Sequence, residues 1–122
     1  MIEGTQRYGK PAADSLTALL YAKVDPSKPF VCDMAQYVTN APKFRLVQRY
    51  SLVCQDAPAL LPKEREIWQA YQYNVQNKLP IAENVQKVDN DFMLYTAPVT
   101  INEKLVGMWS VLVDKKELVK EL

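Results

Sequence analysis

Histidine is absent from this chain of 122 residues, and its absence excludes much chemistry. Without an imidazole, the chain itself cannot supply Ser-His-Asp or Cys-His catalysis, a histidine-ligated zinc or haem, or a histidine pH switch. Glycine is scarce as well, and Gly4, Gly9 and Gly107 form neither a Walker loop nor a dinucleotide-binding fingerprint. These absences argue against histidine-dependent hydrolases and against these two kinds of nucleotide site.

An excess of charge is also missing, because 15 basic and 14 acidic side chains give a net charge of +1. The sequence therefore offers no electrostatic reason to expect nucleic acid or an anionic membrane as the main partner. No apolar stretch approaches the ~18 residues of a transmembrane helix, and the polar N-terminus does not resemble a secretory signal. The content of 48% hydrophobic and 24% charged residues is typical of folded proteins, and the length predicts a single domain over 1–122.

Cysteine occurs only twice, at Cys32 and Cys54. Two cysteines without histidine are too few for a zinc site, and they do not form a CxxC pair. One interpretation is a disulfide that closes a loop of about 20 residues and stabilises the fold by roughly 3 kcal/mol. The other is a pair of buried thiols that pack as small hydrophobic groups. The distance between the two Cα atoms decides between these interpretations.

The first half of the chain is predicted to contain two helices and a strand. The spacing of apolar residues predicts a helix over 12–24, and a second helix is expected over 30–38, before Pro42. Residues 44–54 alternate between apolar and polar, which predicts a long, half-buried strand. One face of this strand is expected to carry Phe44, Leu46, Tyr50, Leu52 and Cys54, and the other Arg45, Val47, Arg49, Ser51 and Val53.

The second half is predicted to form a crossover helix and then a meander. Pro62, with Glu64 and Glu66 after it, favours a helix start, and the apolar stripe that follows predicts a helix over 62–78. Short connections between the later strands force antiparallel pairing. Strands are expected over 81–88, 92–101 and 105–113, with turns at 89–91 and 102–104 and a helix from Lys115. The predicted class is α+β: an antiparallel sheet with N-terminal helices, one crossover helix and a C-terminal helix.

The last third of the chain resembles a known family. Residues 95–99 (Tyr-Thr-Ala-Pro-Val), the turn at 102–104 and residues 105–111 (Leu-Val-Gly-Met-Trp-Ser-Val) are similar to the closing hairpin of PAS-like extracytoplasmic sensors of the Cache type. In that family a helix toward the membrane follows the hairpin, and residues 115–122 match it. Residues 45–68 are more weakly similar to PAS-like sensors that carry c-type haem, although the attachment sequence CxxCH is absent.

This resemblance implies a PAS-like fold and a role in bacterial signal transduction. The chain would be the soluble, periplasmic or otherwise extracytoplasmic part of a longer inner-membrane receptor that serves chemotaxis or two-component signalling. Its partners would be a small-molecule ligand and a second copy of the chain in a homodimer, with membrane contact only through the parent receptor.

Aromatic side chains with hydrogen-bonding groups are the candidates for lining a ligand pocket. We expect this pocket between the sheet and the helix over 62–78, with Arg45 or Arg49 holding a carboxylate through its guanidinium fork. The alternative is that the aromatic residues are ordinary core and the arginines occupy a solvated sheet face. The aromatic candidates are Tyr50, Trp68, Tyr71, Tyr95 and Trp109.

Neither a cofactor nor an enzymatic activity is predicted. Asp89 and Asp91 are explained by a turn, and a cysteine nucleophile would lack a histidine base. No acidic loop with the spacing of a calcium site is present, so no metal is expected. Non-covalent haem is an alternative in which one residue ligates the iron, the candidates being Cys32, Cys54, Met34, Met93, Met108 and the tyrosines.

The sequence is compatible with two functions. The first is a ligand-sensing input domain that binds a small molecule between the sheet and the helix over 62–78. The second is a protein–protein interaction module without a small ligand, in which a sheet edge pairs with a partner strand. A cavity of roughly several hundred Å³ between the sheet and that helix, lined by the aromatic candidates, favours the first function, and a filled interior favours the second.

Overall fold

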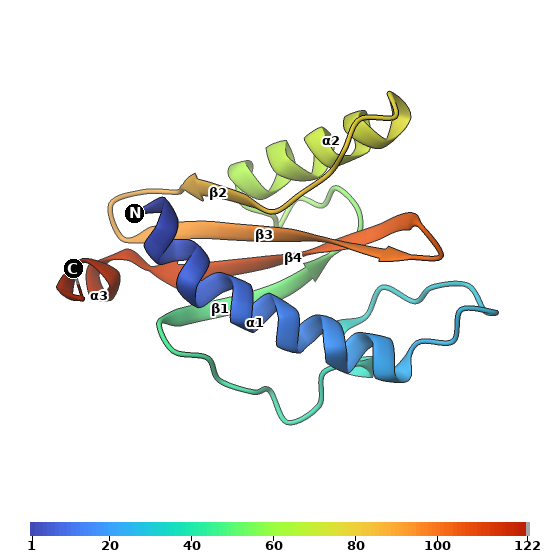
Figure 1. The fold of residues 1–122 in the computed structure, drawn as a ribbon, viewed down its shortest axis with the longest axis horizontal. Helices are drawn as coiled ribbons and strands as arrows, with labels where there is room; N and C mark the ends of the chain where they lie inside the picture. Colours follow the sequence, from blue (N-terminus) through green and yellow to red (C-terminus); the bar gives the residue numbers. More distant parts are fainter. Residues whose placement is uncertain (122) are drawn as a thin grey trace.

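A four-stranded antiparallel sheet forms the middle layer of the structure, a computed structural model that describes residues 1–121 (Figure 1). Its strands are β1 (Val47–Val53), β2 (Asn84–Lys87), β3 (Phe92–Ile101) and β4 (Lys104–Asp114), in the spatial order β1-β4-β3-β2. The α+β class and the antiparallel pairing expected from the sequence are confirmed. Since β1 and β2 lie at opposite edges, the connection between them has to cross the sheet.

Helix α1 (Ile2–Lys23) lies along one face of the sheet and contributes to the larger of two buried clusters (Figure 1). Leu16 and Leu20 are fully buried in this cluster, together with Trp109 and Val111 of β4. Alternate residues of a strand point to opposite faces, so Met108 and Leu112 of β4 face the other layer. We call the layer with α1 the α1 face.

The helix begins earlier than the sequence predicted, at Ile2 rather than at residue 12, and it contains Pro11. Before Pro11 the helix has no large buried apolar side chain, and its buried residues there are Thr5 and Gly9. A Cβ on Gly9 would lie only 2.5 Å from Cγ of Tyr95, so the helix approaches β3 closely at this point. The contact is possible because Gly9 has no side chain, not because the residue is hydrophobic. The spacing of apolar residues in the sequence therefore does not predict this part of the helix.

Helix α2 (Pro62–Gln76) covers the opposite face, which we call the α2 face (Figure 1). Its buried apolar residues share the smaller cluster with residues of β3 and β4, among them Leu94, Met108 and Leu112. The helix starts at Pro62, as predicted, and ends two residues before the predicted end at residue 78. Lys78 adopts a positive φ of 56°, which turns the chain away from the helical direction.

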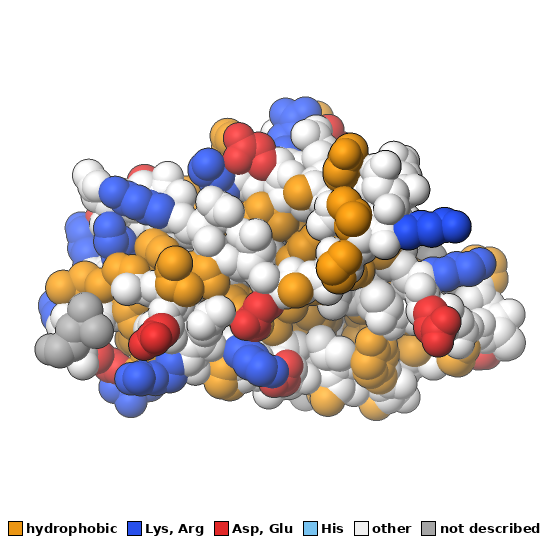
Figure 2. Space-filling model, turned by 45° about the horizontal axis from the view of Figure 1, so that its top comes forward, with side chains coloured by type: hydrophobic (Ala, Val, Ile, Leu, Met, Phe, Trp, Pro, Cys, Tyr) orange, Lys and Arg blue, Asp and Glu red, His pale blue; other side chains and the backbone are white. Residues whose placement is uncertain are grey.

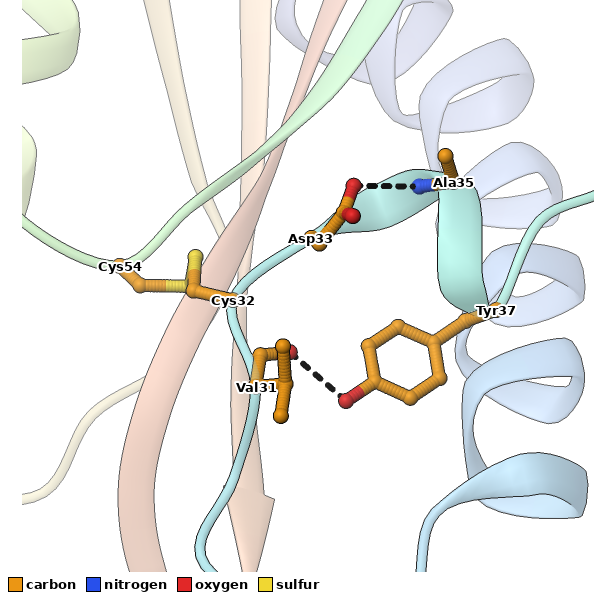
Figure 3. Close-up of a disulfide and its surroundings, with 6 residues drawn as sticks. All are labelled: Val31, Cys32, Asp33, Ala35, Tyr37 and Cys54. Atoms are coloured by element: carbon orange, nitrogen blue, oxygen red, sulfur yellow. Dashed lines mark hydrogen bonds between the residues drawn. A yellow bond between two sulfur atoms is a disulfide. The ribbon is translucent and has the colours of Figure 1, made fainter.

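The segment between α1 and β1 is largely irregular, and the helix predicted over 30–38 is wrong. Only a single 3₁₀ turn forms there, η1 (Met34–Gln36), with the Asp33 carboxylate accepting a hydrogen bond from the Ala35 N–H at 3.1 Å. The Cys32–Cys54 disulfide ties the segment to the end of β1, with the two Cα atoms 6.2 Å apart (Figure 3). This crosslink constrains the path of the segment, and the apolar spacing over 30–38 is too weak to form a helix against that constraint.

Strand β1 is shorter than the predicted 44–54 and is irregular between Val47 and Arg49. The shift in register has the form of a β-bulge, which places successive residues out of simple alternation. Val47 therefore packs with the cluster of the α1 face, whereas the sequence pattern placed it on the face of Arg49. Val53 lies in the cluster of the α2 face, opposite to Tyr50 and Leu52, as the alternation predicted.

Turns of the predicted kind connect the last three strands. The carboxylate of Asp89 accepts hydrogen bonds from the Asp91 and Phe92 N–H groups at 2.7 and 2.9 Å, which closes the turn before β3. Asn102 and Glu103 both have positive φ, the condition for a tight two-residue hairpin that matches the strand twist. Strand β2 is confined to residues 84–87, so the predicted start of that strand at residue 81 is wrong.

The two end helices meet at one end of the molecule (Figure 1). Helix α3 (Lys115–Lys120) starts directly after β4, where the Asp114 carboxylate caps the Glu117 N–H at 3.1 Å. A Cβ on Gly4 of α1 would touch the side chain of Leu118 at 2.9 Å, and Tyr8 donates a hydrogen bond to Glu121. The start of α1 and the end of the described chain are thus in direct contact.

Candidate functional site

The predicted ligand-binding residues lie on both faces of the sheet and do not converge on one cavity. Tyr50, Tyr95 and Trp109 belong to the α1 face, and Trp68 and Tyr71 belong to the α2 face. The sheet separates the two groups, so the expectation of one aromatic-lined pocket does not describe this structure. Each group has to be considered with its own surroundings.

Trp109 and Tyr95 are part of the core between α1 and the sheet. Trp109 is 0% exposed, and its indole N–H donates to the Thr17 hydroxyl of α1 at 3.0 Å. Tyr95 is 2% exposed, and its hydroxyl donates to the carboxylate of Glu83. Burial, and after it the bond to Glu83, raises the pKa of the Tyr95 hydroxyl far above its ordinary value. Both residues are held rigidly by packing.

A groove of about 420 Å³ lies between α2 and the chain that leads into β2, and we call it the α2 groove. Its size is within the range of small-molecule sites. Ile67, Ala70 and Tyr71 of the helix form one wall, and Pro80 and Ala82 belong to the other. The remaining lining residues are polar and include no lysine or arginine: Glu66, Asn74, Glu83, Asn84 and Gln86.

Tyr71 is the only predicted aromatic residue that lines the α2 groove. Its hydroxyl lies 2.8 Å from the Ala82 carbonyl oxygen, to which it donates, and 3.0 Å from the Thr96 hydroxyl. These bonds join α2 to the opposite wall and to β3. Burial raises the pKa of this hydroxyl, so it stays protonated and remains a donor at neutral pH.

Glu83 connects the α2 groove with helix α1. One carboxylate oxygen accepts from Tyr95, and the other accepts from the Gln6 side-chain amide at 3.1 Å. Glu83 also lines the groove. A molecule that binds to this carboxylate therefore competes with, or adds to, contacts that reach α1 from the other side of the sheet.

Glu64 is the most deeply buried acid in the described chain, with a side-chain exposure of 2%. It accepts hydrogen bonds from the Leu61 N–H at 2.7 Å and from the Ser110 hydroxyl, and Arg49 lies 3.9 Å away. The sequence linked Glu64 to the positive N-terminal end of this helix, and its position in the first turn confirms that location. Its depth and its bond to β4 could not be read from the sequence.

A second groove, of about 530 Å³, follows the outer edge of β1. Arg49 and Tyr50 line it, together with residues of the segment before the strand. Arg45 lies elsewhere: it pairs with Glu121 and stands 5.8 Å from the centre of the Tyr8 ring, near the contact of the end helices. The two arginines that were expected to share one face thus serve different parts of the molecule.

Trp68 is 3% exposed, and its indole N–H is the one buried side-chain donor in the described residues without a partner. The residue borders a shallow depression of about 230 Å³ with Gln72, Gln76 and Leu105. Seen from the side of α2, hydrophobic side chains lie between charged ones rather than in one continuous patch (Figure 2). The α2 face thus has a buried donor without a partner, whereas the buried indole of the α1 face is hydrogen-bonded.

The residues considered for iron ligation are dispersed. Cys32 and Cys54 are joined in the disulfide, Met93 lies in the cluster of the α1 face, and Met108 lies in that of the α2 face. Within residues 1–121, no three acidic, cysteine or histidine side chains come together as a metal site. No helix in that part of the chain has the length and apolar character needed to cross a membrane.

The sequence did not reveal most of the groove-lining residues. Asn74, Glu83, Asn84 and Gln86 are polar residues on a helix or in an extended segment, where each is ordinary by itself. The only signal was that Glu83, Asn84 and Gln86 lie close together after Pro80, between a helix and an edge strand. A comparison of the chain with models of known protein families, with curated proteins and with solved structures found no match.

Proposed function

We propose that this chain is a ligand-sensing input domain, PAS-like and of the Cache type, in an extracytoplasmic bacterial receptor. The observation that carries the proposal is the α2 groove, whose volume of about 420 Å³ suits a small molecule. It lies beside α2, and Tyr71 is the one aromatic candidate from the sequence that lines it. The disulfide supports an oxidising, extracytoplasmic location, since such bonds persist there.

The lining of the groove indicates the class of ligand. Two carboxylates, of Glu66 and Glu83, face a site with three amides and no cationic lining residue. Carboxylates and amide oxygens accept hydrogen bonds, and charge-assisted bonds are the stronger ones. The ligand is therefore a small, polar molecule that carries an amine.

The contacts of Glu83 supply a route from the ligand to α1. An ammonium group that binds to this carboxylate changes its bonds to Gln6 and Tyr95. The start of α1 in turn contacts α3, so the end helices respond together. A ligand shifts such an equilibrium only by the difference between its affinities for the two states.

Thermal unfolding in a panel of amino acids, diamines and other small amines tests the proposal, after native mass spectrometry of the purified chain for a retained molecule. A true ligand at about 100 times its Kd stabilises the fold by roughly 2.7 kcal/mol. Glu83→Gln abolishes the stabilisation, and Glu103→Gln, a matched change in an exposed turn, preserves it. Equal responses of the two variants, or no binding of any amine, would overturn the proposal and favour an interaction module.

A further inference from the structure

The groove along β1 is built differently from the α2 groove. One wall consists of four consecutive strand residues, Val47–Tyr50, and the other comes from residues 41–44, with Met34 and Val38 at its end. The Tyr50 hydroxyl donates to the Pro42 carbonyl oxygen at 2.6 Å and holds the two walls together. We call this site the β1 groove. Its volume of about 530 Å³ again suits a small molecule.

The lining of the β1 groove is mostly apolar, with charges of one sign. Met34, Val38, Phe44 and Val47 provide hydrophobic surface. The charged lining residues are Lys43 and Arg49, and no acid lines the groove. This pattern is complementary to a molecule that has an apolar body and an anionic head.

The guanidinium of Arg49 is half exposed and forms one long ion pair, with Glu64, so it keeps donors for such a head. Its side chain is 52% exposed, and its nearest acid, Glu64, lies 3.9 Å away, beyond a direct hydrogen bond. Glu64 is already satisfied by Leu61 and Ser110. An arginine fork with this exposure can bind a carboxylate through two parallel hydrogen bonds.

A disulfide and a side-chain hydrogen bond hold the segment that forms one wall of the β1 groove. The Cys32–Cys54 disulfide anchors the segment at its start, and Tyr37 donates to the Val31 carbonyl oxygen at 2.7 Å (Figure 3). Ala41 and Leu46 have positive φ, a conformation that costs free energy for residues other than glycine and asparagine. Strained backbone of this kind clusters at ligand sites, where the surrounding structure maintains it. Such preorganisation lowers the entropic cost of binding.

From these observations we infer that the β1 groove is a second ligand site, which binds a small amphipathic carboxylate: its apolar body contacts Val38, Phe44 and Val47, and its carboxylate binds to Arg49 and Lys43. The site takes a ligand of opposite charge to that of the α2 groove and does not depend on the function proposed for the latter. A peptide strand paired with the edge of β1 is the competing occupant, and the groove's volume favours the smaller molecule.

Calorimetric titration of the full chain with decanoate, below its micelle concentration, tests this inference. Decylamine has the same apolar chain and the opposite charge, so it serves as the matched ligand. We expect decanoate to bind with a Kd below about 1 mM and decylamine to bind at least about tenfold more weakly, a difference of roughly 1.4 kcal/mol.

Substitutions in the β1 groove test whether decanoate binds there. Arg49→Gln is expected to weaken decanoate binding at least about tenfold, and Val47→Glu, which places a like charge in the groove, to abolish it. Lys87→Gln, an equal loss of charge at an exposed position of β2, leaves the affinity unchanged. Because Arg49 is also close to Glu64, the unfolding temperature of each variant is measured first, and Lys43→Gln provides a second test with an exposed residue.

Three results would overturn the inference: equal binding of decanoate and decylamine, unchanged affinity in both Arg49→Gln and Val47→Glu, or no binding of decanoate at millimolar concentration. Binding of extended peptides instead, with protection of the β1 amide hydrogens, would assign the edge to a partner strand. None of these results bears on the α2 groove, which is assayed with amines and Glu83→Gln. The two proposals therefore fail separately.

Discussion

Helices α1 and α2 pack against the same sheet, yet their contacts differ in kind. On the α1 face a glycine lets the helix approach β3 closely, and the indole of Trp109 is both buried and hydrogen-bonded. On the α2 face the smaller cluster includes an indole N–H without a partner and lies next to the buried carboxylate of Glu64. Both grooves lie at edges of the sheet rather than under α1. The comparison indicates that the α1 face provides stability, while the α2 face and the sheet edges are available for binding.

The largest effect is expected from Trp109→Ala, which removes the biggest side chain of the α1 face. The loss of a fully buried tryptophan typically lowers the free energy of unfolding by about 3–5 kcal/mol. Denaturant unfolding measures it, and Tyr73→Ala, at a residue of α2 that is 60% exposed, should stay within about 0.5 kcal/mol of the wild type. A loss below about 1 kcal/mol for Trp109→Ala would contradict the assignment of this face as the stabilising one.

Removal of the disulfide by Cys32→Ser is the next largest perturbation. The bond closes a loop with a sequence separation of 22, which corresponds to about 3 kcal/mol in the chain-entropy model. Cys54→Ser and the double variant should each cost the same amount, since all three remove one bond. Additive losses in the double variant would show instead that the two sulfur atoms stabilise the fold separately.

Gly9→Ala tests the close approach of α1 to the sheet. The new Cβ would meet Tyr95 at 2.5 Å, so the helix or the ring has to move, at a cost of about 1–3 kcal/mol. Gly4→Ala is the control, because its Cβ would meet only the flexible end of Leu118. Thermal unfolding of the pair should show a clear loss for Gly9→Ala and a small change for Gly4→Ala. Equal changes would mean that the contact with Tyr95 adjusts freely.

High pH should weaken the fold through Tyr95. Because the folded state raises the pKa of this hydroxyl, its contribution is complete below the unfolded pKa of about 10 and is lost as the pH rises above it. Tyr95→Phe should cost about 1 kcal/mol at neutral pH, for the bond to Glu83, and should flatten the decline between about pH 9 and pH 11. Tyr73→Phe is the control, and an unchanged slope in Tyr95→Phe would refute the assignment.

The smallest effect is expected from Trp68→Phe on the α2 face. This substitution removes a buried N–H that has no partner, and relief of that penalty offsets the lost packing, so we expect a change within about 0.5 kcal/mol. Trp109→Phe removes a satisfied N–H and should cost more than about 1 kcal/mol. Equivalent losses in the two variants would remove the difference between the faces.

Regular periodicity made the sheet and α2 predictable from sequence. The meander was recognised because strand alternation and turn residues agree, and α2 because Pro62 marks its start. The first half of α1 was missed because Thr5 and Gly9 pack by small size, which no hydrophobic pattern records. The helix expected over 30–38 was wrong because a crosslink between distant residues, and not local propensity, determines the path of that segment.

The candidate sites were predictable only in part, because their walls come from irregular chain. Tyr71, Arg49 and Tyr50 were named from sequence and line the two grooves. Their partners across each groove lie in residues 34–44 and 80–86, which have little periodicity. Tyr95 and Trp109 were named for the same chemical reason, but strand alternation alone does not say whether a helix covers them.

The packing of α1 has a consequence for how the protein is made. The helix is synthesised before the sheet that covers it, and Trp109, the partner of its Thr17, lies 92 residues further along the chain. Until β3 and β4 have left the ribosome, the apolar stripe of α1 has no surface on which to be buried. Contacts of such long sequence separation slow folding and leave hydrophobic surface exposed in the meantime. The apolar stripe of α1 is therefore made before the surface that buries it, and it stays open to non-native contacts during that interval.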